Sequence, residues 1–154
     1  MNHKLALPVS DGLVLVGCSK EKSATRRALA AFDLYDGGCV PPMRGRLGYW
    51  PHRDRVRFLS AEHGLVHADT PLHTYDRPLD PHRAVELRPR VAAALTAEFD
   101  ATGVPDEILV VAEPLYLVLL ADLLAHPARP RIHWIPDHAS GWSDATRVLD
   151  TWGW

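Results

Sequence analysis

The sequence has little of what marks secreted or membrane-spanning proteins. Only two cysteines occur among its 154 residues, which is too few for the disulfide framework of a small secreted domain. No apolar run approaches the roughly 20 residues that a membrane-spanning helix needs. The N-terminal segment also lacks the long hydrophobic core of a signal peptide. We therefore expect a cytoplasmic protein without a membrane partner.

An excess of charge of either sign is missing as well. The formal net charge is −2, which argues against the generally basic surface of many nucleic-acid-binding proteins. A local basic face remains open, because arginines gather in and beside one polar segment: Arg44, Arg46, Arg53, Arg55 and Arg57. Recognition of an anionic partner would then depend on a local site.

Most of the short motifs that identify a reaction are absent. The sequence contains neither the G-x-x-x-x-G-K-[ST] phosphate loop nor the G-x-G-x-x-G dinucleotide motif. A G-x-S-x-G nucleophile motif is also missing. Nine histidines are present, but no H-E-x-x-H or C-x-x-C spacing accompanies them. We expect neither a metal site nor a cofactor.

What the sequence does contain is an alternation of strand-like and helix-like segments. Short apolar stretches typical of buried parallel strands occupy residues 13–16, 56–59, 107–111 and 131–135. Helical patterns follow them at residues 25–35, 81–99, 114–124 and from 142 to the end. Ser23 and Asp80 are the candidate N-caps, Pro89 is expected to kink or split the second helix, and residues 36–55 are expected to form a surface loop.

This order of segments predicts the fold class. It indicates an α/β fold of three layers, with a mainly parallel sheet of about four strands and helices on both faces. A chain of this length fits one domain, residues 1–154.

Polar turns follow the predicted strands, where ligands of parallel sheets bind. The first turn offers Ser19, Lys20 and Lys22 to a phosphate or carboxylate. Cys18 stands beside them as a candidate nucleophile, because nearby lysines favour a thiolate. The alternative reading is that Cys18 is a small buried residue at a strand end and that the lysines are simply solvated.

Groups suited to proton transfer follow the second and third strands. His63 and Glu113 are the candidate general acids or bases. Ser60 and Gly64 accompany His63, Tyr116 accompanies Glu113, and Tyr75 and Asp76 follow farther along. We expect Lys20, Ser60 and Glu113 to rim one hollow, although a plain surface loop is the alternative for residues 60–65.

Four stretches together resemble a known group of bacterial domains: VGCSKEK, AFDLYDGG, LSAEHGLV and TYDRPL. They are similar to the YaaA peroxide-stress proteins and to the core domain of archaeosine synthase, over roughly residues 12–80. Carried over by position, the resemblance marks these residues as substrate-binding or catalytic: Cys18, Ser19, Lys20, Lys22, Asp33, Tyr35, Ser60, Gly64, Tyr75 and Asp76.

The resemblance implies a nucleobase, nucleoside or nucleic acid as the partner. The chain is too short for the additional nucleic-acid-binding elements of both relatives, which favours a small molecule. The leading hypothesis is an enzyme that transfers or cleaves a glycosidic or C–N bond of a nucleoside, nucleotide or modified base.

Two other function classes stay open. One is a non-catalytic nucleic-acid-binding or stress-response module that uses the arginines above. The other is a structural partner or homodimer, formed through the apolar segment 114–124 and the tryptophans near the C-terminus.

Overall fold

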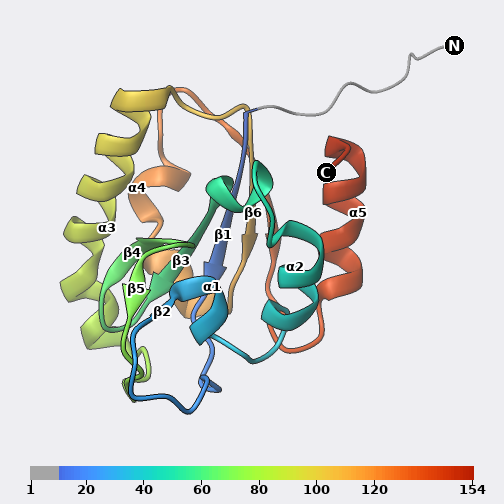
Figure 1. The fold of residues 1–154 in the computed structure, drawn as a ribbon. Coiled ribbons are helices and arrows are strands. Elements are labelled where there is room, and N and C mark those ends of the chain that lie inside the picture. The colour runs from blue at the N-terminus through green and yellow to red at the C-terminus, as the bar shows by residue number, and fades with distance from the viewer. Residues whose placement is uncertain (1–10) are drawn as a thin grey trace, which may run out of the picture.

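The computed structural model describes residues 11–154, and a five-stranded sheet forms its middle layer (Figure 1). The strands are β1 (Gly12–Gly17), β3 (Val56–Ser60), β4 (Gly64–His67), β6 (Glu107–Val111) and β7 (Arg131–Ile135). Their spatial order is β4-β3-β1-β6-β7. All neighbours pair in parallel except β3 and β4, which form an antiparallel pair.

Helices cover both faces of the sheet, so the expected three-layer α/β fold is confirmed. One face carries α1 (Ala31–Leu34), α2 (Val40–Leu47) and α5 (Trp142–Trp152). The other carries α3 (Pro81–Thr102), the 3-10 helix η2 (Pro114–Val118) and α4 (Ala121–Leu124).

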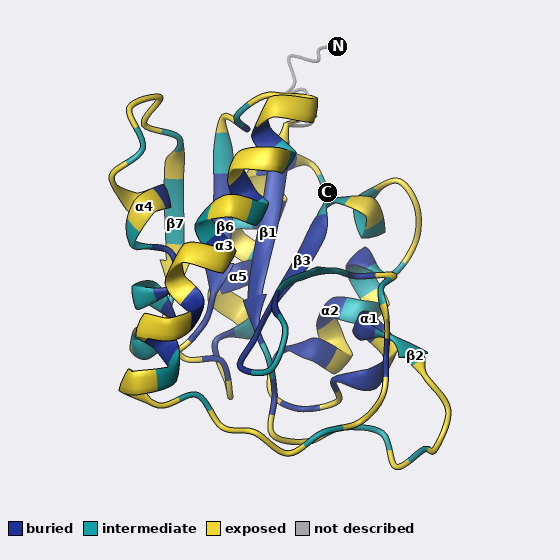
Figure 2. Cartoon of the chain, turned by 90° about the vertical axis from the view of Figure 1, so that its left-hand side faces the viewer, coloured by how far each residue is buried: buried dark blue, intermediate teal, exposed yellow. Residues whose placement is uncertain are grey.

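Strand β1 joins the two hydrophobic cores. Val14 and Val16 pack with α1, α2 and α5, whereas Leu13 and Leu15 pack with α3 and η2. A strand buried on both faces explains the continuous apolar run that predicted it. Figure 2 shows β1 and β3 in the colour of buried residues, while the outer side of α3 is exposed.

The predicted helix at residues 25–35 is wrong except for its last turn. Residues 23–28 have no regular structure, Leu29–Ala30 forms the short strand β2, and α1 is only four residues long. Strand β2 pairs antiparallel with β5 (Pro71–Leu72). The neighbouring backbone N–H groups of Ala31 and Phe32 donate to the carbonyls of Thr70 and Ala68. These long-range bonds replace the helical ones, although Phe32 and Tyr35 stay buried as the pattern required.

The predicted loop at residues 36–55 contains two helices. One is α2 and the other is the 3-10 helix η1 (His52–Arg55). Pro41 and Pro42 lie in the first turn of α2, where backbone N–H groups have no partner within the helix. The two prolines, which suggested a loop, are therefore compatible with a helix start.

Two further helix boundaries differ from expectation. Pro89 does not split α3, which runs unbroken over 22 residues from its N-cap Asp80. Val85, whose carbonyl the proline leaves without its helical partner, lies on the exposed side of α3, where water can reach that carbonyl. The single helix expected at 114–124 is instead η2 followed by α4.

Among residues 11–154, no helix combines the length and the apolar character required to cross a membrane.

Candidate functional site

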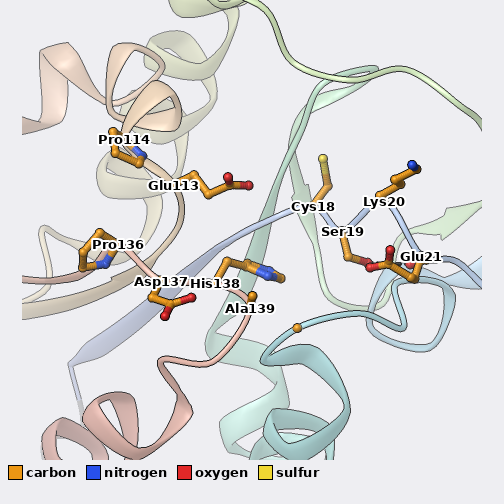
Figure 3. A pocket seen from close by; sticks show the side chains of 11 residues that line it. Cys18, Ser19, Lys20, Glu21, Glu113, Pro114, Pro136, Asp137, His138 and Ala139 are labelled. Atoms are coloured by element: carbon orange, nitrogen blue, oxygen red, sulfur yellow. Dashed lines mark hydrogen bonds between the residues drawn. The ribbon is translucent and has the colours of Figure 1, made fainter.

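A cavity of about 550 Å³ opens at the carboxyl ends of β1, β6 and β7 (Figure 3). We call it the first cavity. Its walls come from the turn after β1, the start of η2 and the segment after β7: Cys18, Ser19, Lys20, Glu21, Gly38, Glu113, Pro114, Pro136, Asp137, His138 and Ala139.

The topology of the sheet explains why a cavity forms here. The chain leaving β1 turns to the face that carries α1 and α2, whereas the chain leaving β6 turns to the face that carries η2 and α4. Two neighbouring parallel strands whose connections part in this way leave a crevice between their ends. Ligands of open parallel sheets typically bind in such a crevice, so the strand order by itself predicts a ligand site here.

Lys20 and Glu113 are charged side chains of the first cavity that make no ion pair in the described part of the chain. Within residues 11–154, neither the Lys20 ammonium nor the Glu113 carboxylate makes an ion pair or a side-chain hydrogen bond, and both residues are exposed. In Figure 3 the Glu113 carboxylate extends towards the turn that carries Cys18 and Lys20. Both groups are therefore available to a ligand.

His138 also lines the first cavity, and it is buried with one ring nitrogen unsatisfied. The residue is only 8% exposed, and no partner of its Nε2 atom is found among the described residues. Burial lowers the pKa of His138 below its ordinary value of 6.5. A neutral imidazole with one free ring nitrogen in a cavity wall is suited to accept or donate a proton.

Gly38 makes the position of His138 feasible. Its backbone φ is +59°, and a Cβ atom there would lie 2.3 Å from His138 Nδ1 and 2.4 Å from its carbonyl oxygen. The His138 carbonyl accepts a hydrogen bond from Cys39 N at 2.9 Å. The close approach requires glycine.

The turn after β1 is fixed by Ser19. Its hydroxyl donates to the Glu21 carbonyl at 2.5 Å and accepts from Gly37 N at 3.3 Å. Ser19 is thus a structural link between this turn and the start of α2, besides lining the cavity.

Cys18 stands at the boundary with a second cavity of about 380 Å³. Its Sγ atom lies 3.1 Å from the Tyr116 hydroxyl. The second cavity is lined by Cys18, Ser19, Lys20, Lys22, Asp76, Arg77, Pro78 and Tyr116. The two cavities therefore share the wall formed by Cys18, Ser19 and Lys20.

A hydrogen-bonded tyrosine pair lies beneath the second cavity. The hydroxyls of Tyr35 and Tyr75 are 2.5 Å apart, and Tyr75 also lies 2.8 Å from Ser60 Oγ. The Lys22 ammonium lies 4.4 Å from the centre of the Tyr75 ring. The sequence motifs after β1 and β3 are thus joined through Tyr75.

The expected hollow is present only in part. Lys20 and Glu113 line the same cavity, but Ser60 is fully buried, lines neither cavity and lies within hydrogen-bonding distance of Tyr75. Ser60 Oγ also accepts hydrogen bonds from the backbone N–H groups of Glu62 and His63.

Besides Ser60, five other expected residues lie outside the walls of both cavities: the hydrogen-bonded Tyr35 and Tyr75, and His63, Asp33 and Gly64. The His63 ring packs edge-on against Tyr75, with ring centres 5.4 Å apart. Asp33 forms ion pairs with Arg44 and Arg53 instead. Gly64 begins β4 with a φ of +79°. Glycine is therefore required there by the backbone conformation and not by contact with a ligand.

The arginines expected to form a basic face are engaged within the protein. Arg44, Arg46 and Arg53 pair with aspartates. Arg55 donates to the Gly12 carbonyl, and Arg57 is buried against Glu98. The apolar segment after β6 is likewise covered, since Leu119, Leu120 and Leu123 belong to the core under α3.

The described part of the chain holds no group of three or more His, Cys, Asp and Glu side chains arranged for a metal ion. Glu21, Asp137 and His138 line the first cavity but were not among the site residues predicted from the sequence. The signal was available, because Pro136, Asp137 and His138 follow a predicted strand just as Cys18 and Glu113 do.

Comparison with known proteins identifies the family. Residues 13–133 match the model of a family of unknown function, DUF6884. The chain belongs to this family. The matched region begins within β1 and ends within β7, so it includes the turn after β1 and the start of η2 but not the segment after β7. No curated protein and no solved structure matches the chain.

Proposed function

We propose that this member of the DUF6884 family is a cytoplasmic enzyme that acts on a nucleoside, nucleotide or modified nucleobase. The reaction is transfer or cleavage at a glycosidic or C–N bond, and the first cavity is the active site. One observation carries the proposal. Lys20, Glu113 and His138, which have no side-chain partner among the described residues, come from three different strand ends and line one cavity.

The chemistry of these groups supports a polar small molecule as the ligand. An unpaired ammonium group attracts an anionic group of the ligand. A carboxylate and a neutral imidazole in the same cavity are both proton acceptors: one removes a proton from the incoming nucleophile, and its protonated form then donates that proton to the leaving base. The buried Nε2 atom of His138 remains without a partner among the described residues at a cost in stability, which supports a ligand that completes it.

Each residue has a definite role in the proposal. Lys20 binds the anionic part of the ligand, with Lys22 beside it. Glu113 and His138 exchange protons with the leaving base and the incoming nucleophile. His138 takes the role that the sequence gave to His63, because His63 lines neither cavity. Cys18 shapes the turn or acts as the nucleophile.

The nucleoside part of the proposal depends on the resemblance to the YaaA proteins and to archaeosine synthase. That resemblance involves the turn at residues 17–23, which forms a wall of both cavities. The alternative, a nucleic-acid-binding module, finds less support, since the arginines it requires are engaged within the protein.

A thermal-shift screen of free bases, nucleosides and nucleotides tests the proposal. A ligand that binds only the folded state raises the unfolding temperature by mass action. Ligands that do so are then incubated with the protein, and release or transfer of the base is followed by chromatography. Absence of any shift and of any turnover across the panel would contradict the proposal.

Substitutions of Lys20 and Glu113 test whether the ligand binds in the first cavity. Lys20→Ala and Glu113→Gln are each expected to weaken binding of the best ligand about tenfold, the usual loss for a charged hydrogen bond. Arg26→Ala is the matched control, because Arg26 is exposed and lines neither cavity. Equal affinity in all three variants would place the ligand elsewhere.

A further inference from the structure

We infer that the two cavities form one divided binding site, and that its ligand is a nucleoside phosphate rather than a nucleoside or a free base. The phosphate occupies the second cavity and the base occupies the first. This inference rests on the proposed function and names its substrate class.

The two cavities are continuous. They share the wall of Cys18, Ser19 and Lys20. A smaller hollow of about 220 Å³ joins them, since it is lined by Lys20 and Glu113 from the first cavity and by Lys20, Pro78 and Tyr116 from the second. One extended molecule can therefore reach both.

The charges of the two cavities are opposite. The second cavity is lined by the cationic Lys20, Lys22 and Arg77 and by one carboxylate, Asp76. Apart from the shared Lys20, the charged groups of the first cavity are carboxylates: Glu21, Glu113 and Asp137. A phosphate is attracted to the second cavity and repelled from the first.

Lys22 is the cation best placed to bind the phosphate. Its ammonium group lies over the ring of Tyr75 and near the ring of Tyr35, at 4.4 and 5.9 Å from the ring centres. It donates to the Lys20 carbonyl at 3.4 Å, and no carboxylate between residues 11 and 154 pairs with it. Arg77, by contrast, already pairs with Glu62 at 2.7 Å. Lys22 is therefore held in place with its charge uncompensated.

The first cavity offers acceptors to the N–H groups of a base. Asp137 is held by Ser140, whose hydroxyl and backbone N–H both donate to its carboxylate. Glu113 has no internal partner in the described chain. Carboxylates accept hydrogen bonds from the amino groups on base edges. Cys18, in the shared wall, then lies beside the sugar that joins the two parts.

Calorimetry with matched ligands tests the division. The ligands are a nucleoside, its 5′-monophosphate and ribose 5-phosphate, chosen for the base that gives the largest thermal shift. We expect the nucleotide to bind at least tenfold more tightly than either of the others, because only it fills both cavities. Equal affinity for nucleoside and nucleotide, or for ribose 5-phosphate and nucleotide, would overturn the inference.

Two variants assign each part of the ligand to its cavity. Lys22→Met keeps an unbranched apolar stem over the tyrosine rings but removes the charge. It is expected to lower the affinity for the nucleotide about tenfold and to leave the affinity for the nucleoside unchanged. Glu113→Gln is expected to weaken nucleoside and nucleotide by the same factor. Lys22→Arg, which restores the charge, should recover part of the nucleotide affinity.

The outcomes separate this inference from the proposed function. If nucleosides bind and the phosphate adds nothing, or if Lys22→Met weakens both ligands equally, the inference is wrong and the proposed function stands. If neither nucleosides nor nucleotides bind, both are wrong. The unfolding temperature of each variant shows whether its fold is intact.

Discussion

The hydroxyl oxygens of Tyr35 and Tyr75 lie 2.5 Å apart, and Tyr75 is also within 2.8 Å of Ser60 Oγ. Tyr35 follows α1, Tyr75 follows β5 and Ser60 ends β3. Three segments that are distant in the sequence are therefore held together by hydroxyl groups. Burial raises the pKa of Tyr35 to about 12 and also raises the pKa of Tyr75, so both phenols remain protonated hydrogen-bond donors at neutral pH.

This tyrosine pair makes stability sensitive to alkaline pH. A phenol whose pKa is higher in the folded than in the unfolded state stabilises the fold fully below its ordinary pKa of 10.0. The stabilisation is lost as pH rises from there towards 12. A rise in pKa of this size corresponds to about 3 kcal/mol. We expect the free energy of unfolding in urea to fall across that range, and to fall less in Tyr35→Phe. An identical alkaline loss in that variant would show that Tyr35 is not responsible.

Replacement of Gly38 by alanine tests the support of His138. The positive φ and the contact with His138 are both unfavourable for a Cβ atom. Gly38→Ala is expected to lower the free energy of unfolding by roughly 2 kcal/mol and to weaken ligand binding. Gly45→Ala is the control, since a Cβ there meets nothing within 4 Å. It lies in α2 and is expected to stabilise the fold by about 0.5 kcal/mol. Equal effects of the two substitutions would contradict the close packing of Gly38 against His138.

The two cysteines are expected to differ in reactivity. Cys18 is half-buried in the shared wall of the cavities, whereas Cys39 is buried. Burial also raises the pKa of the Cys39 thiol. Iodoacetamide should therefore label one thiol of the folded protein, and Cys18→Ser should abolish that labelling. A bound nucleotide should slow it. Rapid labelling of Cys39 in the folded protein, detected by mass spectrometry of peptides, would contradict this assignment.

Arg57 is expected to be the arginine most important for stability. Its guanidinium is buried, donates to Glu98 Oε1 at 2.7 Å and also donates to two backbone carbonyls. Arg57→Leu leaves the Glu98 carboxylate without a cation, and should lower the free energy of unfolding by about 3 kcal/mol. Arg147→Ala, which removes an exposed pair with Asp144, should cost less than about 0.5 kcal/mol. If Arg57→Leu and Arg147→Ala lowered the free energy of unfolding in urea by similar amounts, Arg57 would not be paired as described.

The sequence predicted the central strands and the edge of the sheet where the cavities lie. Both follow from apolar runs and from the polar residues after them, which are local features. Part of what it missed depends on contacts between distant segments. Leu29 and Ala30 fitted a helix by spacing, but they pair with Leu72 and Pro71 in a short ribbon. The antiparallel strand β4 was missed for a local reason: it follows β3 after a turn of only three residues, and its start was taken as part of a polar turn.

The residues of the candidate site were likewise predicted only in part from the sequence. Cys18, Lys20 and Glu113 follow directly from strand ends, and they do line the first cavity. Asp33 was assigned only through the resemblance to known domains, and in this structure it pairs with arginines. The polar residues after β7 are a local signal for His138, but its close packing against Gly38, a residue 100 positions earlier in the chain, is not.

A nuclear magnetic resonance titration of the isotope-labelled protein tests the central claim most directly. The claim is that a nucleotide binds where the turn after β1, the start of η2 and the segment after β7 meet. The account predicts that the amide signals which shift most belong to residues 18–22, 113–116 and 136–139. Shifts concentrated instead around the exposed Tyr49 and Trp50, which follow the C-terminal end of α2, or no shifts at all, would contradict it.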